Sequence, residues 1–276
     1  MQKPECSSCP KQQECNQAIA SIPVNNIKNK IMVLSGKGGV GKSTVAASLA
    51  LFLANAGFKV GLLDTDLHGP SIPKMLGLEK VELETDENSI LPVKAEDNLQ
   101  TLSTGFLVDA VERPLIWKGP IKHKVINQFI TQTKWGTLDY LIVDCPPGTG
   151  DEPMSVIMSL GDVTGAIVVT TPQQLAISDV KKSVSFCREM NVPILGVIEN
   201  MSGFICPGCE EIHEIFKSGG AEKLAGEMDI RFLGKIPIDP KIVEACDNGR
   251  LLEEIKSSNN FKNYMKVITD GLKEVA

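Results

Sequence analysis

The sequence predicts a doubly wound α/β fold with a mostly parallel sheet, and three observations support this prediction. Short runs of Val, Ile and Leu alternate along the chain with longer segments of helical periodicity. Several of these runs are almost continuously apolar, as expected of strands that are buried on both faces of a parallel sheet. A glycine-rich segment, residues 36–44, lies between the first apolar run and the first helical segment, which is typical of a phosphate-binding loop.

The apolar runs and helical segments give the expected order of elements. Strands are predicted at residues 31–34, 59–63, 99–103, 140–143, 166–170, 194–198 and 232–236. Helices are predicted at residues 43–56, 121–133, 175–190, 221–227, 241–248 and 260–273. Because strand and helix alternate, right-handed crossovers are expected, and ligands should bind at the carboxyl ends of the strands. The last helix spaces its apolar residues for core packing, and its mixed charges argue against a membrane-binding face.

Length, charge and cysteine content limit the classes of protein to consider. The chain has 276 residues, 42% of them hydrophobic, which suits one α/β domain at residues 29–276 after a polar, cysteine-containing extension at residues 1–28. The formal net charge of −6 argues against a general nucleic-acid-binding surface. No apolar run approaches the ~18 residues of a membrane span, and the polar N-terminus has no signal-peptide pattern. We therefore predict a soluble, cytoplasmic protein that binds neither a membrane nor nucleic acid.

The glycine-rich segment meets the pattern G-x-x-x-x-G-K-[ST] in full. Glycines there let backbone N–H groups converge on phosphate oxygens, and the N-terminus of the following helix adds partial positive charge. Lys42 is expected to reach the β- and γ-phosphates, and the Ser43 hydroxyl is expected to bind Mg²⁺. A glycine-rich turn with a chance lysine is the plainer interpretation, but the flanking strand and helix favour the loop. The predicted nucleotide-binding residues here are Gly36, Lys37, Gly38, Gly39, Val40, Gly41, Lys42, Ser43 and Thr44.

Carboxylates follow two of the predicted strands. Asp64 and Asp66 come after the strand at residues 59–63, and Asp144 comes after the strand at residues 140–143. Hydrolysis of a nucleotide needs one carboxylate to orient the attacking water and others to hold Mg²⁺. The alternative is helix capping by Asp66 or a turn built on Gly69 and Pro70, but neither requires both acids. An aspartate that ends an apolar strand is the Walker B arrangement, so Asp144 is predicted to act on magnesium.

Two cysteines in the last third of the chain have the spacing of metal ligands. Cys206 and Cys209 form C-x-x-C around a Pro-Gly turn, which can aim both sulfur atoms at one metal. Two thiolates are half of a tetrahedral set, so a symmetric dimer with both pairs on its twofold axis would supply four. The alternatives are zinc with His213 as a third ligand, a redox pair, and cysteines without a role. A thioredoxin-type pair is disfavoured, because it opens a helix in a small βαβ fold.

Three more cysteines lie close together in the N-terminal extension. Cys6, Cys9 and Cys15 have the spacing C-x2-C-x5-C, which in a reducing compartment suggests a second metal site with zinc or an iron–sulfur cluster. Both usually take four ligands, and no fourth Cys or His lies nearby, so a tail with free thiols is the alternative. The remaining cysteines are isolated and are expected to be small buried apolar residues: Cys145, Cys187 and Cys246.

Taken together, these motifs resemble the Mrp-type (ApbC-like) branch of the deviant-Walker P-loop ATPases. Members of that branch are iron–sulfur cluster carriers related to the MinD, ParA and nitrogenase iron-protein ATPases. The resemblance extends from Lys30 to about Leu252. Its most specific feature is Lys37 in the loop combined with the late C-x-x-C. The segments that carry it are residues 36–44, 64–71, 117–120, 144–151, 200–209 and 234–240.

The resemblance implies how the nucleotide is hydrolysed. Lys37 corresponds to the signature lysine, which reaches across a dimer to the partner's nucleotide and stabilises charge on the transferring phosphoryl group, as an arginine finger does. Asp66 corresponds to the carboxylate that positions the attacking water, and Asp144 to the Walker B acid. Ser43, Asp66 and Asp144 together are the implied magnesium site.

The resemblance also implies what the base and the cysteines bind. Asn200 would contact adenine, with Ile236 and Pro237 lining the base pocket, and no N-K-x-D guanine motif is present, so ATP is preferred. Cys206 and Cys209 match the family's cluster cysteines, which implies one [4Fe-4S] cluster shared by a homodimer. The N-terminal thiols resemble the extension of a eukaryotic cytosolic subgroup that has four cysteines, of which the last three are matched here.

The expected function is therefore that of an ATP-hydrolysing, homodimeric scaffold. It would use ATP and Mg²⁺, bind an iron–sulfur cluster and pass the cluster to apoproteins. The alternative belongs to another class, a positioning or partitioning ATPase of the MinD/ParA type without a metal cluster. The C-x-x-C motif, the acidic net charge and the lack of a basic terminal helix favour the carrier.

Overall fold

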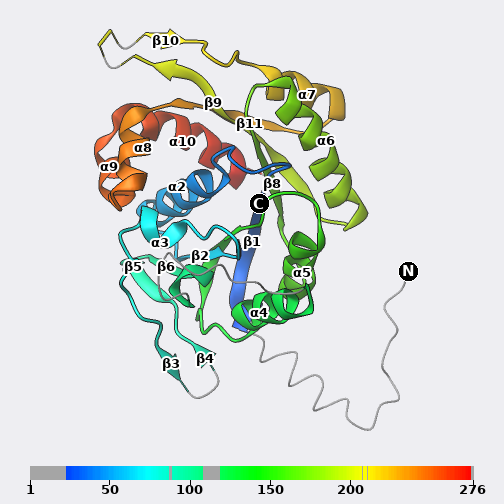
Figure 1. The fold of residues 1–276 in the computed structure, drawn as a ribbon, viewed down its shortest axis with the longest axis vertical. Helices are drawn as coiled ribbons and strands as arrows, with labels where there is room; N and C mark the ends of the chain where they lie inside the picture. Colours follow the sequence, from blue (N-terminus) through cyan, green and yellow to red (C-terminus); the bar gives the residue numbers. More distant parts are fainter. Residues whose placement is uncertain (1–22, 87–88, 108–118, 207, 210, 275–276) are drawn as a thin grey trace.

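The computed structural model of the chain describes residues 23–86, 89–107, 119–206, 208–209 and 211–274. A nine-stranded sheet forms the centre of the fold (Figure 1), in the order β10-β9-β8-β1-β7-β2-β6-β5 with β11 also paired to β9. All pairs are parallel except β5 with β6 and β10 with β9. The strands of this sheet are β1 (Ile27–Leu34), β2 (Val60–Asp64), β5 (Val93–Glu96), β6 (Leu99–Ser103), β7 (Leu138–Asp144), β8 (Gly165–Thr170), β9 (Ile194–Ile205), β10 (Ile212–His213) and β11 (Phe232–Ile238).

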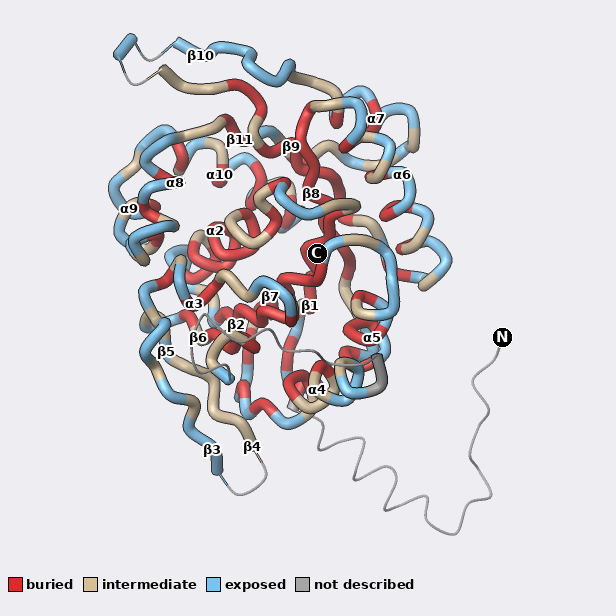
Figure 2. The backbone as a smooth tube through the Cα atoms, in the orientation of Figure 1, coloured by how far each residue is buried: buried red, intermediate tan, exposed pale blue. Residues whose placement is uncertain are grey.

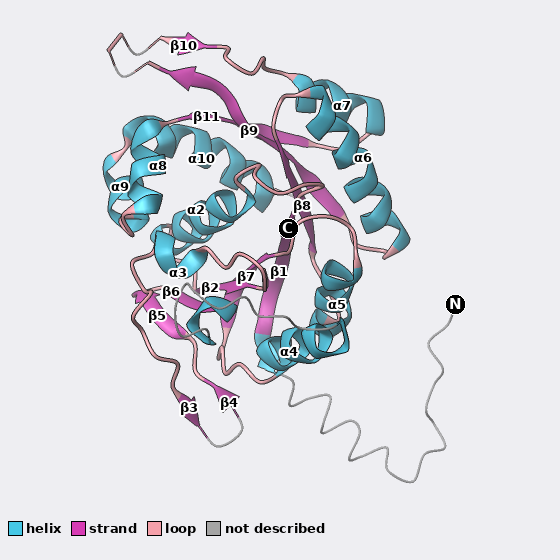
Figure 3. Cartoon of the chain, in the orientation of Figure 1, coloured by secondary structure: helices cyan, strands magenta, loops and turns pink. Residues whose placement is uncertain are grey.

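Helices cover both faces of the sheet (Figure 3). One face carries α2 (Lys42–Asn55), α3 (Ile72–Met75), α8 (Pro240–Asp247), α9 (Leu251–Ser257) and α10 (Asn259–Lys273). The other face carries α4 (Gly119–Thr131), α5 (Asp151–Leu160), α6 (Gln174–Glu189) and α7 (Gly220–Met228). The smaller elements are two 3₁₀ turns, η1 (Pro23–Asn26) and η2 (Thr104–Leu107), and a two-stranded sheet of β3 (Thr85–Asp86) and β4 (Ser89–Ile90).

The central strands are buried on both faces, as their apolar runs predicted. In β1, Ile31 and Val33 pack on the side of α2, while Met32 and Leu34 pack on the opposite side. This alternation follows from the two-residue period of a strand. Figure 2 shows the buried residues concentrated along β1, β7, β8 and α2, so the loop between β1 and α2 joins two of the most deeply buried elements.

The predicted fold class, a doubly wound and mostly parallel sheet, is confirmed. Each of the seven predicted strands and six predicted helices is present. The strand at residues 99–103 has the predicted bounds, and the other elements have shifted boundaries. The largest shift is in β9, predicted to end at residue 198, which continues to Ile205. Its second half pairs with β11 and β10, so backbone pairing continues where the apolar pattern has stopped.

Three helices that the sequence pattern did not predict, α3, α5 and α9, lie between predicted elements. The terminal helix α10 buries Phe261, Met265, Ile268 and Leu272 against α2 and β11, which confirms the predicted core-packing face. None of the helices described here combines the length and the apolar character that a membrane crossing requires.

Candidate functional site

The loop at residues 36–44 connects β1 to α2 and has the backbone of a phosphate cradle. Gly39 and Gly41 have φ values of 78° and 79°, which L side chains rarely adopt. A Cβ atom at Gly41 would lie 2.2 Å from Asn200 Nδ2, and one at Gly36 would lie 2.5 Å from Asp179 Cβ. Glycine is therefore required at Gly36 and Gly41 for the loop to pack between its neighbours. The loop leads into the N-terminus of a 14-residue helix, which favours anion binding.

Lys42 lies at the centre of a buried charged group. Its Nζ is 2.5 Å from Asp144 Oδ1, and the two side chains are 7% and 0% exposed. Burial lowers the pKa of Lys42, but the charge of Asp144 outweighs it and raises the pKa above the ordinary value. Lys42 therefore carries its positive charge at the phosphate end of the loop, where a nucleotide would need it.

Asp64 faces Asp144 across neighbouring parallel strands, because β2 and β7 pair these two residues in register. The Asp64 carboxylate is fully buried and accepts hydrogen bonds from Ser103 Oγ at 2.9 Å and the Asp66 N–H at 3.1 Å. Burial, followed by the charge of Asp144, raises the pKa of Asp64 to about 7, against the opposing effect of Lys42. The second Asp144 oxygen, Oδ2, is buried without a hydrogen-bond partner among the described residues. This oxygen and the surplus of carboxylates over cations suit a hydrated magnesium ion.

Asp66 lies two residues beyond Asp64, in the loop after β2, and is half-buried. Its Oδ1 accepts the backbone N–H groups of His68 and Gly69, both at 3.2 Å. The turn interpretation and the functional interpretation of this residue are therefore compatible, since the second carboxylate oxygen remains for other contacts. Asp64, the last residue of β2, is the acid that lies beside Lys42 and Asp144, although sequence reasoning emphasised Asp66.

A cavity of about 160 Å³ opens beside the loop. Asn200 and Pro237 both line it, together with apolar residues of α2, β11 and α8. The Asn200 Nδ2 donates a hydrogen bond of 2.8 Å to the Val40 carbonyl. Because the predicted strand ended at residue 198, Asn200 was expected to follow it. In the structure Asn200 lies within β9, so this strand directly contacts the phosphate loop.

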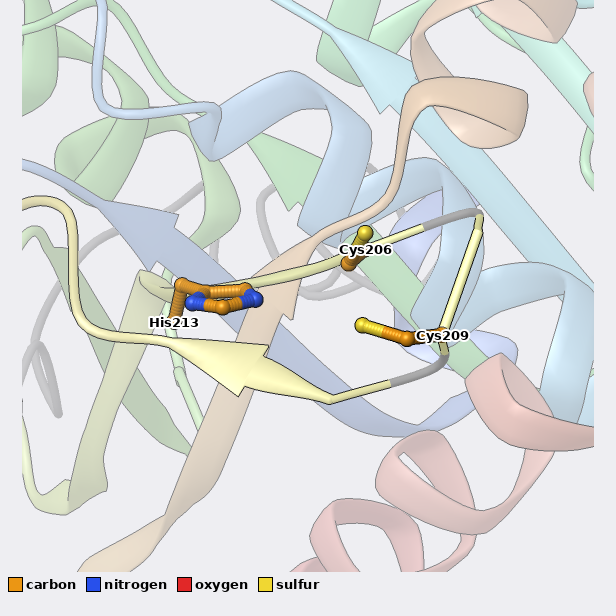
Figure 4. A group of neighbouring side chains, drawn as sticks. All are labelled: Cys206, Cys209 and His213. Carbon is orange, nitrogen blue, oxygen red and sulfur yellow. The ribbon is translucent and has the colours of Figure 1, made fainter.

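The C-x-x-C motif lies at the end of a hairpin formed by β9 and β10, which projects beyond the helical layers (Figure 1). The Cys206 N–H donates to the Glu211 carbonyl at 2.9 Å, so the hairpin ladder continues to the first cysteine. Cys206 is half-buried and Cys209 is exposed. The backbone N–H groups of Cys209 and Gly208 point at the Cys206 sulfur and lower the pKa of that thiol. Figure 4 shows His213 beside the pair, and the ligand atoms of the three side chains lie within 4.8 Å of one another.

The base of the hairpin is anchored by Glu199, the residue before Asn200. Its buried carboxylate accepts the N–H groups of Gly219 and Ala221, at 2.8 Å and 2.7 Å, and the Ser202 hydroxyl at 2.6 Å. These hydrogen bonds fix the N-terminus of α7, where the chain returns from the hairpin, to β9. Sequence reasoning did not identify Glu199, although a lone acid after an apolar strand was the available signal.

The other predicted residues are placed as follows. Lys37 is half-buried and its amino group takes part in no ion pair within the described residues. Cys145 and Cys187 are buried, as expected, whereas Cys246 is only partly buried. Burial raises the pKa of all three thiols, to about 11 for Cys187, which disfavours the reactive thiolate. The remaining predictions fall outside the described residues: Cys6, Cys9, Cys15, Trp117 and Lys118.

One group near the nucleotide site was not predicted. Lys122 Nζ lies 2.6 Å from both His68 Nε2 and Glu152 Oε1, which connects the loop after β2 to the start of α5. These contacts span 54 and 30 positions in the sequence, so no local pattern indicates them. The group connects the loop that follows β2, on which Asp66 lies, to the helix that follows β7, the strand that ends at Asp144.

Comparisons with known proteins give a consistent result. Residues 26–272 match the family model described as ParA, NUBPL iron-transfer P-loop NTPase. The iron–sulfur cluster carrier protein of Methanocaldococcus jannaschii is 46% identical over an alignment that covers 96% of each chain. The cytosolic Fe–S cluster assembly factor NUBP2 homologue of Dictyostelium discoideum is 51% identical and covers 82% of this chain and 87% of its own.

Solved structures agree with the fold. A nucleotide-binding protein from Archaeoglobus fulgidus, described in complex with ADP and with Co, superposes with a TM-score of 0.77 at 36% identity, covering 91% of this chain and 96% of its own. The cell division ATPase MinD of Pyrococcus furiosus superposes with a TM-score of 0.65 at 23% identity, covering 90% of this chain and 99% of its own, which shows the shared fold alone.

Proposed function

The chain belongs to the ParA family of NUBPL iron-transfer P-loop NTPases, and we propose that it is an ATP-hydrolysing, homodimeric carrier that passes an iron–sulfur cluster to apoproteins. The observation that carries this proposal is that one strand, β9, contacts both sites. Asn200 in β9 hydrogen-bonds the phosphate loop, and the same strand ends at Ile205, immediately before Cys206. In this proposal, β9 connects the nucleotide site to the hairpin that would bind the metal.

The loop residues would hold the phosphates of ATP through backbone N–H groups, and Lys42 would contact the β- and γ-phosphates. Lys42 must then be shared between Asp144 and the phosphates, which its central position in the buried group allows. The Ser43 hydroxyl and the carboxylates of Asp66 and Asp144 would hold Mg²⁺, which when bound offsets phosphate charge. Asp64, paired in register with Asp144, would help orient that shell. Asp66 would position the attacking water.

The adenine base would enter the cavity between α2, β11 and α8. Its apolar lining, which includes Pro237 and Ile238, offers a face for a flat ring. Asn200 would contact the base while its amide stays hydrogen-bonded to Val40. ATP is therefore the nucleotide that we propose for this site.

Two chains would complete the cluster site. Each hairpin supplies the thiols of Cys206 and Cys209, so a twofold pair of hairpins supplies the four thiolates that a [4Fe-4S] cluster takes. Apolar residues next to the pair are exposed in the single chain and would be covered in the dimer: Ile212, Ile215 and Phe216. A cluster held by two thiolates from each chain is accessible for release, as transfer to an apoprotein requires.

Lys37 provides a test of the dimeric nucleotide site. Lys37→Ala is expected to leave ATP affinity unchanged and to lower turnover on the order of 10³-fold, the lower end of what a cation supplied in trans contributes. The measurement is the steady-state rate of phosphate release, with ATP affinity determined by calorimetry. The exposed lysine variant Lys80→Ala is the matched control and should retain the parent rate. Equal turnover in Lys37→Ala and Lys80→Ala would argue against a role across the dimer.

The competing assignment is a positioning ATPase of the MinD/ParA type. It is not favoured, because the relatives at 46% and 51% identity carry cluster-carrier and cluster-assembly names, whereas the likeness to MinD at 23% identity shows the fold alone. Anaerobic purification distinguishes the two: the carrier is expected to be brown with bound iron and acid-labile sulfide. Colourless, iron-free protein that still fails to take up a cluster on reconstitution would support the competing assignment. The cytosolic name of the Dictyostelium relative supports a cytoplasmic location.

A further inference from the structure

The hairpin that carries the cysteines brings a third metal-ligand side chain to the same point. His213 in β10 pairs with Phe204 in β9, and Cys206 lies two residues beyond Phe204. Residues two apart on a strand share a face, and directly paired residues share a face, so His213 and Cys206 lie on the same side of the hairpin. The C-x-x-C turn then returns Cys209 to that side (Figure 4).

The distances suit a single metal ion. The two sulfur atoms and an imidazole nitrogen lie within 4.8 Å of one another. Ligands around one tetrahedral ion with metal–sulfur and metal–nitrogen bonds of ordinary length are about 3.5–3.8 Å apart. The difference between these two separations is about 1 Å. Rotation of exposed or half-buried side chains is enough to bring the ligand atoms that much closer. In a [4Fe-4S] cluster, by contrast, each thiolate binds a different iron. The two sulfur atoms therefore lie farther apart than two ligands of a single ion.

The surroundings favour a cation. The Glu211 carboxylate lies 3.8 Å from Cys209 Sγ, and the N–H groups of Gly208 and Cys209 point at Cys206 Sγ, as they do where a turn presents a thiolate to a metal.

We propose that one protomer binds a single divalent transition-metal ion, such as Fe²⁺ or Zn²⁺, through Cys206, Cys209 and His213. Thiolate and imidazole are the ligands that these borderline ions prefer. Binding is redox-neutral: each thiol releases its proton to solvent and the neutral imidazole donates a lone pair. Three protein ligands leave a fourth position for water or an incoming donor. The single chain thus holds one exchangeable ion before two hairpins combine around a cluster. The inference rests on the proposed function only in that both use the same two cysteines.

The test uses Co²⁺ as a spectroscopic probe in the full-length protein with Cys6→Ser, Cys9→Ser and Cys15→Ser, so that the N-terminal thiols contribute nothing. Anaerobic titration is expected to give one Co²⁺ per chain, with intense tetrahedral d–d bands and thiolate charge-transfer bands. His213→Ala in this background should weaken Co²⁺ binding on the order of 10- to 100-fold, since one ligand is lost. His123→Ala removes a histidine from α4, away from the hairpin, and is the matched control.

Two results would overturn the inference: unchanged Co²⁺ affinity and bands in His213→Ala, or one Co²⁺ per two chains with an all-sulfur ligand shell. Cluster reconstitution of the same His213→Ala protein separates this inference from the proposed function. Because the cluster needs only the four thiolates, about four irons per two chains should remain. Failure of the Co²⁺ arm with normal cluster uptake rejects the mononuclear site alone, whereas failure of cluster uptake in the parent protein rejects the carrier.

Discussion

Lys42→Ala is expected to abolish nucleotide binding. The variant removes the cation that contacts the β- and γ-phosphates, and a hydrogen bond to a charged group contributes about 1.5–3 kcal/mol. It also leaves Asp144 and Asp64 buried beside the empty position, so the acidic side chains repel the incoming phosphates. Calorimetric titration with ATP should show a loss of affinity of at least 10²-fold, and normal affinity would mean that the loop has been misidentified.

A second variant separates loss of the site from loss of the fold. Removing one partner of a buried ion pair destabilises a protein by about 3–5 kcal/mol, so Lys42→Ala alone should lower the thermal unfolding temperature. In Lys42→Ala/Asp144→Asn the unpaired charge is gone, and most of the lost stability should return. Nucleotide binding should not return, because the cation is still missing. Recovery of binding in the double variant would show that stability, not Lys42, limits affinity.

Cys206→Ala/Cys209→Ala is expected to remove the cluster almost completely. The pair supplies half of the thiolates of the proposed site in each chain, and the described residues place no other exposed thiol near the hairpin. Anaerobic reconstitution followed by iron and sulfide analysis should give about four irons per two chains in the parent protein and background iron in the variant. Both residues are outside the core, so the unfolding temperature should change little.

The matched control for this variant removes the other group of closely spaced cysteines in the sequence. Cys6→Ser/Cys9→Ser/Cys15→Ser eliminates three thiols of the N-terminal extension and should keep the four irons of the hairpin site. Full iron retention in Cys206→Ala/Cys209→Ala would sink the cluster assignment. A loss of iron in the N-terminal variant beyond those four would instead identify a second site in the extension.

Much of the fold follows from local pattern. Continuous apolar runs such as Ile31 to Leu34 mark strands buried on both faces, and the burial of β1 shows why the pattern is so clear. The helix α5 was missed because its sequence has no clear apolar pattern. It leaves Met154 and Met158 exposed, so its apolar residues do not form one face. The second half of β9 was missed because its polar residues pair through the backbone alone.

The site was predictable where its residues are consecutive and less so where distant segments meet. The loop at residues 36–44 carries its own signature, and acids that follow strands can be found by position. Which acid turns inward cannot be read from the sequence, because the register of β2 against β7 places Asp64 opposite Asp144. The contact of Lys122 with His68 and Glu152 depends likewise on packing between separate elements. His213 was recognisable as a nearby histidine, but only the hairpin register places it beside the cysteines.

The most direct test of the central claim is native mass spectrometry of the reconstituted protein under anaerobic conditions. The protein would carry Cys6→Ser/Cys9→Ser/Cys15→Ser, so that only the hairpin cysteines can hold iron and sulfide in an exposed site. The account predicts a species of two chains with one [4Fe-4S] cluster, which disappears when Cys206→Ala and Cys209→Ala are added. A single chain that carries a complete cluster, or a dimer that carries two, would contradict a cluster shared between two hairpins.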